Sequence, residues 1–129
     1  MKKSFLILLV GVSFSLNTFA SEADFKSGQC MGTTAVLMKK TDDAKIGVSL
    51  KNYWNKNQPY LKSIGDKVGA CMNGRQDGAS HTACANQLPP AQLDFYKGFN
   101  AVLKEAASNN YSQDYLYKIP LLYCMGVAG

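Results

Sequence analysis

Histidine and arginine are almost absent from this chain of 129 residues, which contains only His81 and Arg75 of these two types. A single histidine excludes multi-histidine metal sites and leaves any histidine-dependent catalysis to one residue. A single arginine and a formal net charge of +5 are a poor electrostatic footprint for nucleic-acid binding. The common phosphate-loop, nucleophile-elbow and zinc-protease motifs are also missing. We therefore expect no metal, no cofactor, no nucleic-acid partner and no enzymatic activity.

Only one apolar run stands out, and it lies at the N-terminus. Two lysines precede an apolar segment at 5–12, and Thr-Phe-Ala at 18–20 has the small-x-small pattern of a cleavage site. This arrangement predicts a secretory signal peptide at 1–20, which is too short and too polar near its end to span a membrane. Its removal takes away both lysines, lowers the net charge from +5 to +3 and leaves a single helical domain at 21–129. We expect export, to the periplasm of a bacterium, with no membrane span.

Four cysteines remain in the mature chain, at Cys30, Cys71, Cys84 and Cys124. An even number of cysteines in a small exported domain predicts a disulfide framework, and the lack of C-x-x-C spacing argues against zinc. Of the three pairings allowed, we expect Cys30–Cys71 with Cys84–Cys124 first, and Cys30–Cys124 with Cys71–Cys84 second. Each bridge of the first pairing would close about 40 residues and contribute roughly 4 kcal/mol.

The mature chain has the periodicity of helices, and no long alternating run indicates a strand. The expected helices cover 21–40, then a second helix that is capped at 41–43 and broken or kinked by Pro59, and a third that ends at Asn73-Gly74. After them we expect one turn at 82–87 capped by Ser80, a long helix from Pro89-Pro90 to about 108, a loop or single turn at 112–118, and a last helix from 119 or 120 to about 125. These elements predict an all-α fold, a small four- to five-helix bundle held by two disulfides.

Glycines and tyrosines occur in groups along these helices. Gly28 and Gly32 share one helix face, which either weakens the helix or permits a close crossing with another helix. We favour a close crossing, because Gly65 and Gly69 repeat the spacing. The three tyrosines of 111–117 fit either a half-buried structural role or contact with a partner.

Residues 73–81 are the most polar stretch and are typical of an exposed loop between two helices. Asp77, Ser80 and His81 are the one candidate catalytic set, but catalytic triads are usually built from distant elements rather than from adjacent residues. The loop is better suited to binding a partner, because it is polar, flanked by glycine and long enough to protrude. The expected partner-binding residues are Arg75, Gln76, Asp77, Ser80 and His81. The alternative is that the loop merely joins two helices and that its charges are solvated.

Three positions in the chain have the order seen in a known family. Here they are Cys30-Met31-Gly32 in the first helix, Cys84 followed by Pro89-Pro90-Ala91-Gln92, and Cys124 near the chain end. In this order the chain resembles the helical periplasmic immunity proteins that protect bacteria from peptidoglycan-amidase toxins delivered by type VI secretion. The resemblance implies an inhibitor that plugs the cleft of a toxin, commonly as a homodimer, without catalysis or a cofactor.

A periplasmic chaperone or secretion adaptor is the second hypothesis, because such a protein would also be helical and disulfide-bonded. An acid-activated chaperone needs many titrating groups, and nine carboxylates with one histidine are a modest number. An enzymatic function is the third hypothesis and depends on the 77–81 segment alone.

Overall fold

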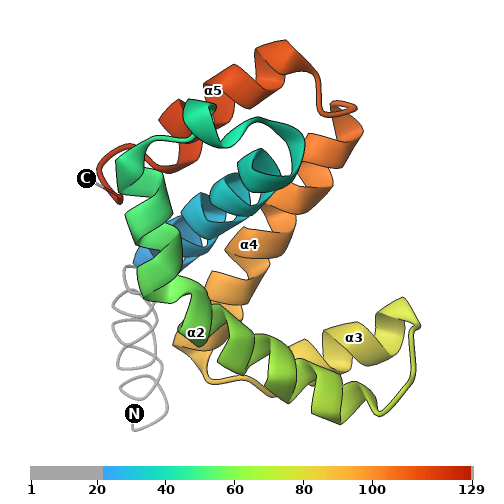
Figure 1. The fold of residues 1–129 in the computed structure, drawn as a ribbon. Helices are drawn as coiled ribbons and strands as arrows, with labels where there is room; N and C mark the ends of the chain where they lie inside the picture. Colours follow the sequence, from blue (N-terminus) through green and yellow to red (C-terminus); the bar gives the residue numbers. More distant parts are fainter. Residues whose placement is uncertain (1–21, 129) are drawn as a thin grey trace, which may run out of the picture.

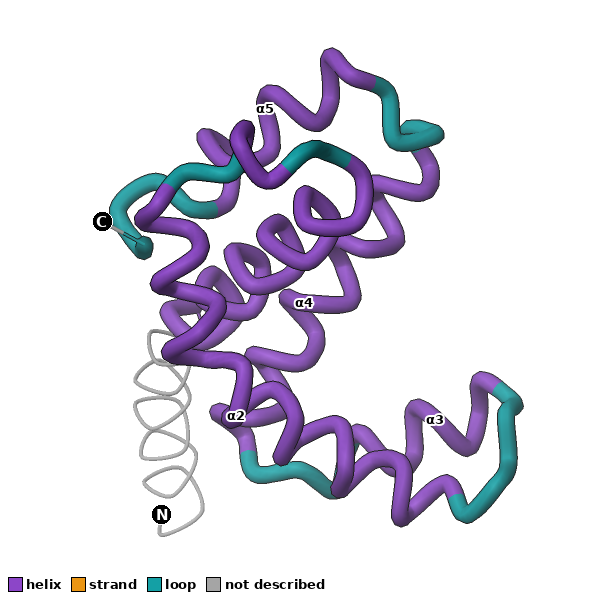
Figure 2. Tube along the Cα trace, in the orientation of Figure 1, coloured by secondary structure: helices purple, strands orange, loops and turns teal. Residues whose placement is uncertain are grey.

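The computed structural model describes residues 22–128, so the expected signal peptide at 1–20 and its cleavage site lie outside the described residues. The described residues form five α-helices and one short 3-10 turn, and Figure 2 shows helices joined by short loops. The elements are the helix at 22–40, η1 (Asp43–Lys45), α2 (Val48–Met72), α3 (Gly78–Ala85), α4 (Pro90–Ser108) and α5 (Gln113–Tyr123). The predicted all-α fold is confirmed.

The helices form a core and a projecting arm (Figure 1). The core contains the 22–40 helix, the first part of α2, α4 and α5. The arm, which we define as residues 60–85, contains the rest of α2, the connecting turn and α3, which packs alongside α2. One buried apolar cluster joins the arm to the core, and a second lies between the 22–40 helix, α4 and α5. The buried members of the first cluster are Met31, Ile64, Val68, Cys84, Leu88 and Phe95, and those of the second are Val36, Leu37, Ile46, Ala106, Leu116 and Ile119.

Helix α2 continues through Pro59 instead of ending there. Proline removes one backbone hydrogen bond and crowds the preceding turn of a helix. The helix bends at that point instead of ending where packing on both sides of the proline stabilises it. Figure 1 shows that α2 changes direction midway along its length. In the turn before the proline, Asn57 Nδ2 donates a hydrogen bond of 2.9 Å to the carbonyl of Tyr53. Of the break or kink that we expected at Pro59, the structure has the kink. The separate third helix that we expected is wrong, because it and the second helix are two halves of one element.

The C-terminal helix also differs from the prediction, because it begins at Gln113 and contains Pro120. Ser112 caps its start by accepting a hydrogen bond from the backbone N–H of Tyr115. Leu116 and Ile119 are buried against the core, so packing compensates for the hydrogen bond that Pro120 cannot make. The expected loop at 112–118 is wrong.

The 22–40 helix crosses α4 with its backbone against the backbone of α4. A β-carbon at Gly28 would overlap the carbonyl oxygen of Phe95, and one at Gly98 would overlap that of Phe25. A β-carbon at Gly32 would lie 2.7 Å from the carbonyl oxygen of Phe99. Only glycine permits this approach, so the close crossing expected at the first glycine pair is confirmed. Gly65 and Gly69 face open space instead, so their spacing does not indicate a helix crossing.

The disulfides are Cys30–Cys124 and Cys71–Cys84, so the pairing that we expected first is wrong and the second choice is present. Cys71 lies in the last turn of α2 and Cys84 lies on α3, and these helices are neighbours in both sequence and space. Cys30 lies in the middle of the first helix, where the returning chain end brings Cys124 to it with 4.7 Å between the Cα atoms. Because the pairing depends on how the helices pack, loop length alone could not predict it.

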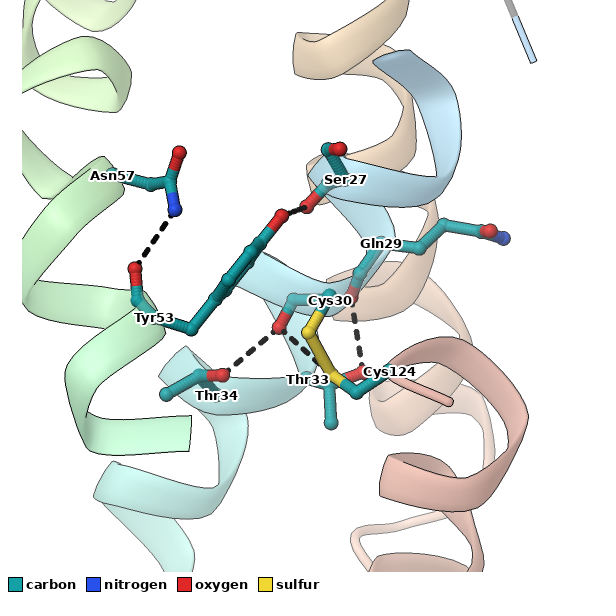
Figure 3. The surroundings of a disulfide bond; sticks show 8 residues. All are labelled: Ser27, Gln29, Cys30, Thr33, Thr34, Tyr53, Asn57 and Cys124. Carbon is teal, nitrogen blue, oxygen red and sulfur yellow. Dashed lines mark hydrogen bonds between the residues drawn. A yellow bond between two sulfur atoms is a disulfide. The ribbon is translucent and has the colours of Figure 1, made fainter. Parts of the chain in front are cut away.

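Buried polar groups around Cys30 are satisfied within the helix (Figure 3). Thr33 and Thr34 are fully buried, and their hydroxyls donate hydrogen bonds of 2.9 Å to the carbonyls of Gln29 and Cys30. Because threonine can use the carbonyl four residues earlier, two hydroxyls are accommodated in the core without a partner on another helix.

The glycine crossing predicts opposite effects for the same substitution at two sites. Gly28→Ala should lower the free energy of unfolding by about 3 kcal/mol or more, because the two helices must separate. The matched change Gly65→Ala, on the exposed surface of α2, should raise it by about 0.5–1 kcal/mol, because alanine is the better helix former. Urea denaturation of the oxidised protein measures both. Equal effects at the two positions would contradict the close crossing.

Candidate functional site

The polar segment that we expected as a loop at 73–81 is a five-residue turn followed by the first turn of a helix. The turn is 73–77, and Ser80 and His81 lie in α3. Asn73 (φ 49°) and Gly74 (φ 84°) take left-handed conformations that end α2, as their sequence predicted. All residues of 73–79 are exposed, so the turn and the start of α3 form the tip of the arm.

Arg75 does not extend into solvent as a free donor but folds back onto the end of α2. Its Nε donates a hydrogen bond of 2.9 Å to the carbonyl of Met72, and a terminal nitrogen donates one of 2.7 Å to the carbonyl of Cys71. The last carbonyls of a helix lack partners within the helix and carry partial negative charge. The guanidinium therefore caps α2 and stabilises the turn.

Asp77 caps the helix on the other side of the turn. Its carboxylate accepts a hydrogen bond of 2.8 Å from the backbone N–H of Ser80. This hydrogen bond from the Ser80 backbone holds the pKa of the carboxyl below its ordinary value of 3.8, and the charge of Arg75 adds a smaller effect in the same direction. The expectation that Ser80 caps a later helix is wrong, because Asp77 starts α3 three residues earlier. The signal available in the sequence was Asp77 itself, because aspartate is one of the preferred residues at a helix N-cap.

His81 connects the arm to the core. Its Nε2 lies 2.7 Å from the hydroxyl of Tyr96 on α4, and both side chains are half-buried. The pair borders a shallow hollow of about 220 Å³, which Asn86, Lys97 and Asn100 also line. No local pattern in the sequence predicts this pairing, because it requires α3 to pack against the start of α4.

The candidate catalytic set does not form a relay. A serine nucleophile needs a hydrogen-bonded base, and that base needs a third group to orient it. Here Asp77 binds the Ser80 backbone, and the Nε2 of His81 pairs with Tyr96. These side chains shape and brace the arm, and the exposed tip offers hydrogen-bonding groups to another molecule.

The Cys71–Cys84 disulfide holds the two helices of the arm together below the tip. It closes a separation of only 13 residues and lies beside a hollow of about 230 Å³ that Lys67, Leu88 and Pro89 also line. Lys67 Nζ donates a hydrogen bond of 3.0 Å to Gln92 on α4, which adds a second link between the arm and the core. The arm is therefore fixed by one covalent bond, two helix caps and two side-chain contacts.

Nothing among residues 22–128 groups three or more histidine, cysteine or acidic side chains in a way that could hold a metal ion. In the same part of the chain, no helix is long and apolar enough to cross a bilayer. The two disulfides indicate an oxidising, exported location. Comparison with protein-family models, curated proteins and solved structures finds no match to this chain.

The cap at Asp77 predicts a pH-dependent contribution to stability. Because the folded state lowers the pKa of this carboxyl, its contribution is present above the unfolded value near 3.8 and is lost as the pH falls through the lower folded value. Asp77→Ala should therefore have a lower free energy of unfolding than the wild type at pH 7. This difference between the two proteins should become smaller below pH 4. Urea denaturation of both proteins from pH 2.5 to pH 7 measures this. A gap independent of pH would show that the charge of the cap contributes nothing.

Proposed function

We propose that the protein is an exported, non-catalytic inhibitor of a toxic cell-wall hydrolase, an immunity protein that acts by protein contact in the bacterial periplasm. The observation that carries the proposal is the arm, whose exposed tip at 73–79 stands away from the helical core (Figure 1). A cell-wall hydrolase must hold its substrate in a cleft, and a projecting element is the shape that enters a cleft. A peptidoglycan amidase is the target that the family resemblance favours.

Rigidity supports this proposal. A flexible loop loses conformational entropy when it binds, whereas a segment fixed in advance avoids most of that cost. Here the disulfide Cys71–Cys84 and the caps at Arg75 and Asp77 fix the tip before any partner arrives. Because these side chains hold the arm in one shape, the arm suits an inhibitor that is preformed for binding.

The chemistry of the tip also supports the proposal of an inhibitor. Gly74, Gly78 and Ala79 have small side chains, so the backbone of the tip can approach a partner closely. Gln76 is exposed between the two capping residues and supplies both a donor and an acceptor. A narrow polar tip of this kind can occupy a cleft lined with hydrogen-bonding groups and exclude the substrate.

A second candidate function is favoured by an exposed apolar face at the C-terminal end. Tyr117, Leu121, Leu122 and Met125 are between 61% and 74% exposed, and Tyr117 and Leu121 lie one helical turn apart on α5. Contiguous apolar exposure of this kind is typical of a surface that contacts other proteins. It suits a periplasmic chaperone or secretion adaptor that holds unfolded segments, or the homodimer contact that the resemblance implies.

The test first identifies the proteins that bind this protein and then determines which of its surfaces binds them. The oxidised protein, tagged at its C-terminus, is incubated with an envelope extract of the bacterium that encodes it, and bound proteins are identified by mass spectrometry. We expect a peptidoglycan amidase, whose release of peptides from isolated cell wall should stop at one equivalent of the protein. Gln76→Arg or Ala79→Arg should weaken inhibition at least about thirtyfold, the loss expected for an interface anchor, with an unchanged melting temperature.

Asn52→Arg is the matched control, since it adds the same side chain to an exposed site on α2 outside the arm and should inhibit like the wild type. Capture of many unfolded proteins, abolished by Leu121→Gln and not by the tip variants, would replace the inhibitor with the chaperone. A captured amidase that stays active at saturating protein would contradict the proposal. Sedimentation of the wild type and Leu121→Gln determines whether the apolar face is covered by a second copy.

A further inference from the structure

A third hollow lies among the core helices, away from the arm. It has a volume of about 350 Å³ and is bordered by the end of the 22–40 helix, the first half of α2, the second half of α4 and the turn that follows α4. This volume is within the range of small-molecule sites, about 300–1,000 Å³. None of its lining residues belongs to the candidate surface on the arm.

The walls of this hollow are mainly apolar, and three of the lining side chains are aromatic. Trp54, Phe99 and Tyr111 line it together with Val36 and Leu103. The three rings are half-buried, so each packs against the core while keeping part of its surface accessible. Accessible aromatic surface around a concave site offers a large contact area to an apolar ligand.

Tyr111 is held in this wall by an unfavourable backbone. It has φ 51° and follows Asn110 with φ 53°, so two residues that are not glycine take the left-handed conformation in succession. This conformation is uncommon for a bulky side chain and persists only where the surrounding structure enforces it. Its consequence is that the Tyr111 ring borders the hollow, with the Nζ of Lys40 4.2 Å from the ring centroid.

The rim carries positive charge and no opposing carboxylate. Lys39 and Lys40 both line the hollow and are exposed, and no aspartate or glutamate is among the lining residues. The cation–π contact with Tyr111 keeps the Lys40 ammonium over the aromatic wall. Two ammonium groups beside an apolar hollow complement a ligand that has an anionic head and an apolar tail.

We propose that this hollow binds a small amphiphilic anion, a carboxylate on a short aliphatic tail. The tail lies against Trp54, Phe99 and Leu103, and the carboxylate lies between Lys39 and Lys40. The occupant is a free small molecule, because the hollow is too small for a docking helix or strand. A carboxylate at the C-terminus of a peptide has the same head-group chemistry, and the experiment includes it as a separate arm. The proposal does not depend on inhibition through the arm.

Trp54 provides a direct readout, because it is the only tryptophan in the chain. The oxidised full-length mature protein is titrated with hexanoate, heptanoate and octanoate below their micelle concentrations while tryptophan emission is recorded. We expect a saturable change, with about fourfold tighter binding for each added methylene that stays within the hollow. Octanoate should bind more tightly than octanol and much more tightly than octylamine, because the rim is cationic.

Charge variants test the rim. The double variant Lys39→Gln, Lys40→Gln should bind octanoate about three- to tenfold more weakly, the range expected for two exposed charge contacts, and should bind octanol unchanged. Lys26→Gln is the matched control, since Lys26 is exposed on the same helix about 20 Å away and should have no effect. Because the lysines are exposed, these variants should all fold, and circular dichroism checks that they do.

Four results would overturn the proposal. They are no saturable Trp54 response to octanoate at millimolar concentration, equal affinity for octanoate and octylamine, no dependence on tail length, and unchanged octanoate binding in the double lysine variant. Tighter binding of a short peptide with a C-terminal leucine than of octanoate would also overturn it, because the occupant would then be a protein terminus.

Discussion

The backbone contact between the 22–40 helix and α4 determines how the other elements are arranged. Gly28 on one helix and Gly98 on the other allow an approach that any side chain would prevent. Cys30 lies in the same part of the first helix, and its bond to Cys124 attaches the end of the chain to this crossing. Helix α5 is thereby held over the second apolar cluster, where Tyr123 also donates a hydrogen bond to Glu105 of α4. The crossing and the long-range bridge together define the core.

The arm is stabilised in a different way, because much of it does not pack against other parts of the chain. Its inner face reaches the core through Ile64 and Val68, while its outer part depends on local interactions. The short-range bridge Cys71–Cys84 and the caps at both ends of the turn supply them. Local bracing of this kind allows an element to project without losing its shape. Of the side chains that we first expected to touch a partner, Arg75, Asp77 and His81 make contacts that shape the arm itself. The contact that we propose therefore rests on Gln76 and its small neighbours.

Local signals in the sequence predicted the elements that depend on local interactions. The long helix α4 has a proline at its first positions and a wide apolar face, and Asn73-Gly74 ends α2 as expected. The start of α5 was missed because Pro120 suggested a break that tertiary packing overrides. A proline effect that depends on burial cannot be read from local sequence.

Features that depend on contacts between distant segments could not be predicted. The glycine pairs at 28/32 and 65/69 have the same spacing, yet only the first meets another helix. The disulfide pairing and the His81–Tyr96 contact likewise follow from how α3 lies on α2 and α4. For the candidate site, the sequence predicted the exposed residues at 73–79 but not the half-buried positions of Ser80 and His81 in α3. The roles of Arg75 and Asp77 as caps also required the geometry.

Amide hydrogen exchange of the oxidised wild type and of Cys71→Ala, Cys84→Ala tests most directly whether the arm is an independently braced element on a separate core. The missing bridge removes about 3 kcal/mol of chain-entropy stabilisation from a short segment. The account predicts faster exchange confined to residues 60–85, with unchanged protection in the 22–40 helix and in α4 from Gly98 onwards. Faster exchange throughout the 22–40 helix and α4 would contradict it, because the core would then depend on the arm.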